Sequence, residues 1–352
     1  MRRRTFLTGL SGMAAVAGGA RPAAAAPATI RSTSNTPPRK VIVGTAIQDL
    51  WGRYPGLPQR LDLLTSLVDR MAEDSRKRYG RGLDLAVLTE TAISGNAGDN
   101  VLKCAVPLEG ALREAFSRAA REHRCYVIAP TYLLETDGKR CSNAAILFAR
   151  DGAVAGIYRK MHLVVAPDGE TMESGSTLGT DAPVFQCDFG RIGMQICYDM
   201  EFDPGWDELA RQGCELVAWP TQSPQTATPA FRAMRERYYI VSSTWRHNAS
   251  VFEPSGRIAA QIRPPESVLA YEIDLSYAIL PWTARLRNGK ALQEKFGERV
   301  GFHYYEDEDR GIFWSNDPAM TIREMARSLG LEERHEQLAR VEGVYRKAGL
   351  RE

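Results

Sequence analysis

The order of apolar and polar positions predicts alternating strands and helices from Lys40 onward. Short apolar runs rich in β-branched residues indicate strands, whereas Leu61, Leu64 and Val68 recur with helical spacing. The pattern runs without a linker to the end of the last such strand, so residues 39–275 are interpreted as one α/β domain with mixed sheets. The expected strands cover residues 41–47, 84–89, 125–132, 143–149, 153–158, 184–188, 192–196, 215–219, 239–244, 249–253, 258–263 and 268–273.

Residues 276–352 form a C-terminal extension with a different pattern. Its first part, residues 276–315, is rich in charged and aromatic residues, and we expect it to be irregular. A helix is predicted from Asp317, with Pro318 at its first position, to Gly330, and a second helix covers about residues 332–348. We expect this helical extension to pack on its own domain or on a partner subunit.

The first 26 residues have the regions of a secretory signal in the usual order. Arg2, Arg3 and Arg4 precede a weakly apolar run rich in glycine and alanine, and small residues follow at positions 24–26. The Arg3-Arg4-x-Phe-Leu sequence resembles the twin-arginine export signal. Residues 27–38 are rich in proline, serine and threonine and predict a linker. We therefore expect an exported, periplasmic or extracytoplasmic protein.

Composition narrows the classes of partner. The chain has 352 residues, and its 45 basic and 43 acidic residues give a net charge of +2 without a basic stripe, so no nucleic-acid partner is expected. No later stretch reaches the roughly 20 apolar residues of a membrane span, so none is expected in the mature chain. The six cysteines form no C-x-x-C pair and no H-E-x-x-H occurs, so neither a metal site nor a cofactor is predicted.

Three reactive side chains share one position relative to the predicted strands. Glu90, Lys160 and Cys197 each follow the carboxyl end of an apolar strand, which is the edge where α/β sheets bind ligands. A thiol of ordinary pKa needs a base to become a nucleophile, and a carboxylate supplies one. An ammonium group stabilises the oxyanion formed when sulfur attacks a carbonyl. Together these groups suffice for acyl transfer through a thioester.

The segments around these residues resemble the three catalytic blocks of the nitrilase superfamily of carbon–nitrogen hydrolases. They are Thr89–Gly95, Tyr158–Leu163 and Gly193–Asp199, in the family's order. The resemblance spans roughly residues 40–274 and implies an αββα sandwich of two mixed sheets that pairs into homodimers or higher even oligomers. It also implies Glu90 as general base, Lys160 as oxyanion stabiliser and Cys197 as nucleophile.

The resemblance also implies a second glutamate, which positions substrate and water in many family members. Glu173 fits best by its spacing to Cys197, and Glu170 and Asp168 are alternatives. The Tyr198-Asp199 pair stands where true nitrilases tend to carry Trp-Glu, which favours an amide-type substrate over a nitrile. Thr89 stands where the family commonly has proline, a difference that removes no catalytic group.

Several assignments stay open at this point. Tyr198, His162 and Arg246 are candidate substrate-binding residues, although a structural role for His162 and a surface position for Arg246 fit the sequence as well. The expected reaction is hydrolysis of a linear amide or N-carbamoyl bond of a small molecule. Nitrile hydrolysis, acyl transfer on the same three residues and a non-catalytic exported binding protein are the alternatives.

Overall fold

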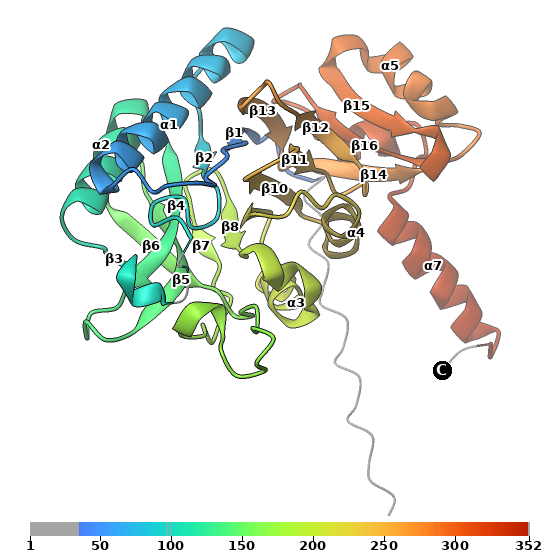
Figure 1. Ribbon diagram of the computed structural model, residues 1–352. Helices are drawn as coiled ribbons and strands as arrows, with labels where there is room; N and C mark the ends of the chain where they lie inside the picture. Colours follow the sequence, from blue (N-terminus) through green and yellow to red (C-terminus); the bar gives the residue numbers. More distant parts are fainter. Residues whose placement is uncertain (1–34, 97, 99, 351–352) are drawn as a thin grey trace, which may run out of the picture.

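The computed structural model describes residues 35–350 except residues 97 and 99, and its main part is a sandwich of two sheets (Figure 1). The predicted signal peptide and most of the predicted linker lie outside the described residues. The first sheet has the strand order β13-β1-β2-β4-β5-β6, with β3 added beside β4. Its strands are β1 (Lys40–Ala46), β2 (Leu85–Val87), β3 (Val106–Pro107), β4 (Tyr126–Leu134), β5 (Cys141–Phe148), β6 (Val154–Arg159) and β13 (Val268–Asp274).

The second sheet has the order β12-β11-β10-β9-β8-β7 and packs face to face on the first. Apolar side chains from both sheets, such as Val43 and Val87 from the first and Met194 and Val241 from the second, form one buried layer between them. Burial of this layer is the main favourable term that holds the two sheets together. The strands are β7 (Phe185–Gln186), β8 (Arg191–Met194), β9 (Leu216–Thr221), β10 (Tyr239–Thr244), β11 (Ala249–Phe252) and β12 (Ile258–Ile262).

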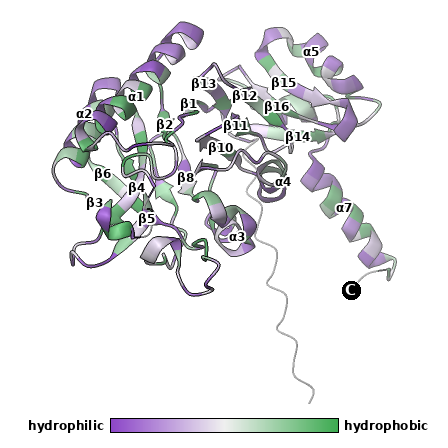
Figure 2. Ribbon diagram, viewed as in Figure 1, coloured by the Kyte–Doolittle hydropathy of each residue, from purple (hydrophilic) through white to green (hydrophobic). Residues whose placement is uncertain are grey.

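Helices cover the outer face of each sheet, which confirms the expected αββα sandwich. Helices α1 (Leu57–Tyr79) and α2 (Ala111–His123) pack on the first sheet, and α3 (Asp203–Arg211) and α4 (Ala227–Glu236) pack on the second. Figure 2 shows hydrophobic positions concentrated in the central strands and hydrophilic positions along much of α1. In the part of the chain that the structure describes, every helix is too short or too polar to cross a membrane.

The expectation that residues 276–315 are irregular was wrong. This segment forms a three-stranded antiparallel sheet in the order β14-β16-β15, with helix α5 (Lys290–Phe296) beside it. One side of the sheet faces the extension's own small core, and the other packs on the sandwich through Ile312 and Trp314. The strands are β14 (Tyr277–Pro281), β15 (Val300–Tyr305) and β16 (Arg310–Ser315). The extension therefore contacts its own domain.

The two predicted C-terminal helices exist, but the first begins later than expected. Helix α6 (Ile322–Arg327) is capped by Thr321, whose hydroxyl accepts from the N–H of Glu324 while that glutamate bonds back. Asp317 instead accepts from the N–H of Ala319 in a preceding turn. Helix α7 (Arg334–Lys347) projects from the body, and none of its residues is buried (Figure 1).

Gly179 lies in the segment between β6 and β7, which passes close to the carboxyl end of β6. Its N–H donates to the carbonyl oxygen of Lys160 at 2.8 Å. A Cβ atom at this position would lie 2.1 Å from the carbonyl oxygen of Arg159, which is main chain and unable to rotate away. Only glycine therefore permits this approach beside the strand that ends at Lys160.

Replacing Gly179 by alanine is expected to lower the free energy of unfolding by about 1–3 kcal/mol, because the added methyl group forces main chain apart. Gly343→Ala is the matched control: Gly343 lies in α7 with open space around it, and alanine there is expected to stabilise by about 0.5–1 kcal/mol. Chemical denaturation measures both values. A Gly179→Ala protein as stable as the wild type would contradict the close approach.

Candidate active site

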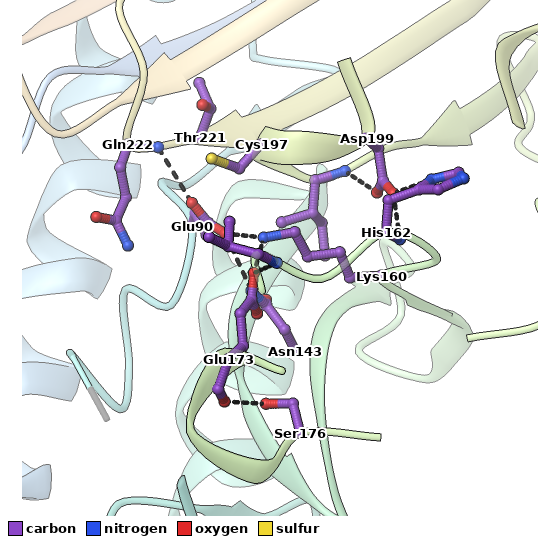
Figure 3. Close-up of polar contacts among 12 residues, drawn as sticks. Glu90, Asn143, Lys160, His162, Glu173, Ser176, Cys197, Asp199, Thr221 and Gln222 are labelled. Atoms are coloured by element: carbon purple, nitrogen blue, oxygen red, sulfur yellow. Dashed lines mark hydrogen bonds and ion pairs between the residues drawn. The ribbon is translucent and has the colours of Figure 1, made fainter. Parts of the chain in front are cut away.

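Topology brings the ends of three strands to one edge of the sandwich. In the first sheet β2 is parallel to β4, and β6 runs the same way because β5 is antiparallel to both neighbours. In the second sheet β8, β9 and β10 are parallel to one another, and a parallel bridge from Ile47 to Thr244 aligns them with β1. The carboxyl ends of β2, β6 and β8 consequently point to the same edge. Glu90, Lys160 and Cys197 follow these ends and line one pocket (Figure 3).

Lys160 is the buried centre of this cluster. Its side chain is 1% exposed, and its Nζ atom donates to Glu90 Oε1 at 2.9 Å and to a carboxylate oxygen of Glu173. Burial opposes the charge on Lys160, but the carboxylates of Glu90 and Glu173 outweigh it and hold the pKa of the amine well above its usual value. The lysine is therefore a fixed cation.

The loop between β6 and β7 places Glu173 at the cluster. Glu173 contacts Lys160 and has its pKa raised by burial and by the neighbouring Glu90 carboxylate, against the effect of the ammonium. The alternatives Glu170 and Asp168 are exposed, and Asp168 accepts from the N–H groups of Glu170 and Thr171 within its own turn. Of the three candidate acids in this loop, the structure brings only Glu173 to the pocket.

Asn143 on β5 joins the two glutamates and was missed in the sequence. Its Nδ2 atom donates to Glu90 Oε1 and to Glu173 Oε2, each at 3.0 Å. Because only the nitrogen of the side-chain amide can donate, the two carboxylates beside it fix the positions of Nδ2 and Oδ1. The second oxygen of Glu90 accepts from the main-chain N–H of Gln222 at 3.2 Å. Glu90 is thus held by three donors while only 2% exposed.

Cys197 begins a short 3-10 turn shortly after β8, with Gln195 and Ile196 between them. Its φ angle of +43° bends the chain sharply, so the thiol turns toward the pocket and not along the strand. Burial, and then the charge of Glu90, raise the pKa of the Cys197 thiol to about 12, although Lys160 acts in the opposite direction. The thiol is therefore protonated at neutral pH, and it needs a base to react.

Asp199, also missed as a structural residue, ties the nucleophile turn to the end of β6. One carboxylate oxygen accepts from Tyr158 Oη at 2.7 Å and from the N–H of Ile196 at 2.9 Å. The other accepts from the main-chain N–H and from Nδ1 of His162, both at 2.9 Å. Asp199 is fully buried and links the segment that carries Cys197 to the one that carries Lys160.

The three candidate substrate-binding residues lie elsewhere. His162 is held by Asp199 and stacks on Phe202 with ring centroids 4.1 Å apart, which is a structural position. Tyr198 is 37% exposed and packs edge-on against the same phenylalanine. Arg246 is exposed at the end of β10. None of the three is among the described residues that line the pocket.

The pocket has a volume of about 490 Å³, which suits a small organic molecule. Its floor holds the cluster just described, and neutral side chains and main chain form its remaining described wall. The described lining residues are Glu90, Asn96, Gly98, Tyr132, Lys160, Val164, Ala166, Glu173, Ser174, Cys197 and Gln222.

The family is shown by a match between residues 50–280 and the model named "Carbon-nitrogen hydrolase". This match covers more than half of the chain, and the chain belongs to the carbon–nitrogen hydrolase family. A sandwich with a cysteine, two glutamates and a lysine in one pocket agrees with that membership.

Similar proteins include amidases. The chain is 26% identical to "Omega-amidase NIT2" of Danio rerio over 240 residues, which are 60% of this chain and 86% of that relative. It is 26% identical to "Omega-amidase NIT2" of Homo sapiens over 230 residues, which are 59% and 83%. Nit3 of Saccharomyces cerevisiae, a member of branch 10 of the nitrilase superfamily, has a similar fold with a TM-score of 0.58 at 20% identity, covering 67% of this chain and 90% of that one.

Replacing Asp199 by asparagine is expected to lower the free energy of unfolding by about 1–3 kcal/mol, because an NH₂ group then faces a donor in a buried place. Turnover is expected to fall as well, since both linked segments carry reactive groups. Tyr158→Phe removes only one of the four donors and is the milder control, with an expected loss of about 1 kcal/mol. Denaturant unfolding measures both; an Asp199→Asn protein no less stable than Tyr158→Phe would contradict this role.

Proposed function

We propose that this protein hydrolyses a non-peptide carbon–nitrogen bond, of amide or N-carbamoyl type, through a thioester on Cys197. The observation that carries the proposal is the meeting of Glu90, Lys160 and Cys197 in one pocket. A protonated thiol, a carboxylate and a fixed cation are the groups that such a reaction needs.

The first half of the proposed reaction forms the thioester. Glu90 takes the Cys197 proton as sulfur attacks the amide carbonyl, because the thiol with its raised pKa is not ionised beforehand. Lys160 and the main-chain N–H of Tyr198 hold the oxyanion. Collapse of the tetrahedral intermediate breaks the carbon–nitrogen bond, and protonated Glu90 gives its proton to the leaving amine.

The second half hydrolyses the thioester. Glu90 removes a proton from water, which attacks the acyl carbon, and the sulfur leaves and recovers a proton from Glu90. Glu173 positions substrate and water in this scheme. Asn143 donates to both carboxylates and so holds them in fixed positions relative to each other. The deacylating water therefore needs no metal ion in this scheme.

Two considerations favour amide hydrolysis over nitrile hydrolysis and acyl transfer. The Tyr198-Asp199 pair follows the nucleophile where true nitrilases tend to carry Trp-Glu. The relatives described above bear amidase names, and we extend that activity to this chain as part of the proposal. A homodimer or higher even oligomer built on the sandwich is proposed with it.

Replacing Cys197 by alanine is expected to abolish ammonia release and to leave folding intact. Intact-mass measurement of the wild type, with a panel of amides, N-carbamoyl amino acids and nitriles, is expected to trap an acyl adduct that the variant lacks. Cys104→Ala is the matched control, because Cys104 is half-buried and lies outside the described pocket lining. Wild-type ammonia release by Cys197→Ala would refute the assignment.

We also propose export through the twin-arginine route, since Arg3 and Arg4 stand before an apolar segment. Replacing both by lysine keeps the charge but removes the pair that the export machinery reads, so the uncleaved protein is expected to stay in the cytoplasm. Arg2→Lys is the control and is expected to be exported normally. Cell fractionation with immunoblotting measures this, and equal export of the Arg3/Arg4 variant would contradict the route.

A further inference from the structure

Tyr132 on β4 lies beside the catalytic cluster, and the proposed reaction gives it no role. Strands β4 and β5 run between β2 and β6 in the first sheet, and Tyr132 stands directly opposite Asn143 of β5. Side chains of directly opposite residues in an antiparallel pair project from the same face of the sheet. Tyr132 therefore stands next to the residue that joins Glu90 and Glu173, and it lines the same pocket.

Packing fixes the position of the Tyr132 ring. The residue is 6% exposed and forms a small apolar cluster with Val101 and Cys141. Cys104 and Ala105 pack against this cluster. A side chain whose ring is held by packing presents its polar end at a defined place, which is what a residue that recognises a ligand needs.

The hydroxyl of Tyr132 has a proton to donate and no acceptor among the described residues. Its main-chain N–H donates to Ser94 Oγ at 3.0 Å, but its hydroxyl makes no hydrogen bond with the part of the chain that the structure describes. Burial, and then Glu173 and Glu90, hold the pKa of the phenol well above its usual value, against the effect of Lys160. The hydroxyl is therefore protonated, and a donor so far from bulk water gains from a ligand that supplies an acceptor.

The acyl part of the substrate is the part that extends into the rest of the pocket. A primary amide loses only ammonia, which takes its proton from Glu90 in the proposed reaction. The acyl group is then left to fill most of a pocket of about 490 Å³. Outside the catalytic cluster, the other polar side chains of the described lining are Asn96, Ser174 and Gln222, and all three are more exposed than Tyr132. The buried hydroxyl is the group best placed to discriminate between acyl groups.

We infer that Tyr132 binds substrate, donating a hydrogen bond from its hydroxyl to an oxygen acceptor on the acyl chain of the amide. The inference rests on the proposed function and adds the class of acyl group to it. An acyl chain that carries such an oxygen is favoured over an apolar chain of the same size, because only the oxygen satisfies the buried donor. The contact is worth about tenfold in kcat/KM, the loss expected when one hydrogen bond between uncharged groups is removed.

The test compares two primary amides of similar size, succinamide and isocaproamide. The far end of the first carries a carbonyl oxygen, and the far end of the second is an isopropyl group. Tyr132→Phe keeps the ring and removes the hydroxyl, so the ratio of kcat/KM for succinamide to that for isocaproamide is expected to fall about tenfold. The fall is expected in the KM of succinamide, with kcat nearly unchanged, because the contact lies away from the reacting atoms. An unchanged ratio would overturn the inference, and so would wild-type turnover of isocaproamide alone.

Tyr126→Phe is the matched control, because Tyr126 lies on the same strand but outside the described pocket lining. Its hydroxyl accepts from the main-chain N–H of Asp188 at 3.3 Å. This variant is expected to leave the ratio of the two amides unchanged. The ratio does not depend on how much of a variant is folded, so a loss of stability cannot imitate the effect. An equal fall in Tyr126→Phe would overturn the assignment to the pocket hydroxyl.

Binding without turnover separates this inference from the proposed function. Titration calorimetry measures the Kd of succinamide for Cys197→Ala, which cannot react, and for Cys197→Ala with Tyr132→Phe. The second Kd is expected to be about tenfold higher, and the Kd of isocaproamide is expected to be equal in both. Equal Kd values for succinamide, or no binding of succinamide to Cys197→Ala, would overturn the inference. If no amide of the earlier panel formed an adduct or released ammonia, the proposed function would fail, while these Kd values would still decide the role of Tyr132.

Discussion

The ion cluster around Lys160 is the constraint on which the site depends. A charge removed from water is costly, and an ion pair offsets that cost only with good geometry and satisfied remaining donors and acceptors. Here one ammonium is shared by Glu90 and Glu173, and Asn143 donates to both carboxylates. The ends of β2 and β6, strand β5 and the loop that carries Glu173 must therefore keep their places for the charges to stay compensated. The sandwich supplies that rigidity through the apolar layer between its sheets.

Local patterns predicted the sandwich but not the sheet of the C-terminal extension. Most of the domain's strands are apolar and bounded by turn residues, so periodicity shows them. Strands β15 and β16 mix aromatic, charged and glycine positions, because one face contacts the small core of the extension and the other contacts the domain. Helix α6 was misplaced for a similar reason: the Asp317-Pro318 pair imitates a helix start, and the capping box at Thr321 is the true one.

The active-site residues also divide into those that the sequence predicted and those that it did not. Glu90, Lys160 and Cys197 were predicted because reactive side chains at strand ends have few structural explanations. Asn143 lies inside a buried strand, where a lone amide gives no signal until its two partners are known. Arg246 lies at a strand end but outside the described pocket lining, so its contact with substrate stays a prediction. Sequence position identifies strand ends, and three-dimensional packing decides which of them meet.

The raised pKa of Cys197 has a chemical consequence beyond hydrolysis. Oxidants such as peroxides and disulfides attack thiolates, and a thiol that stays protonated reacts with them slowly. The burial and the Glu90 charge that keep the proton on sulfur therefore also shield it from sulfenic acid formation and from mixed disulfides. Because the thiol loses its proton only as it attacks substrate, it can react during turnover and still resist oxidation between turnovers. This is useful wherever no reducing buffer protects cysteine.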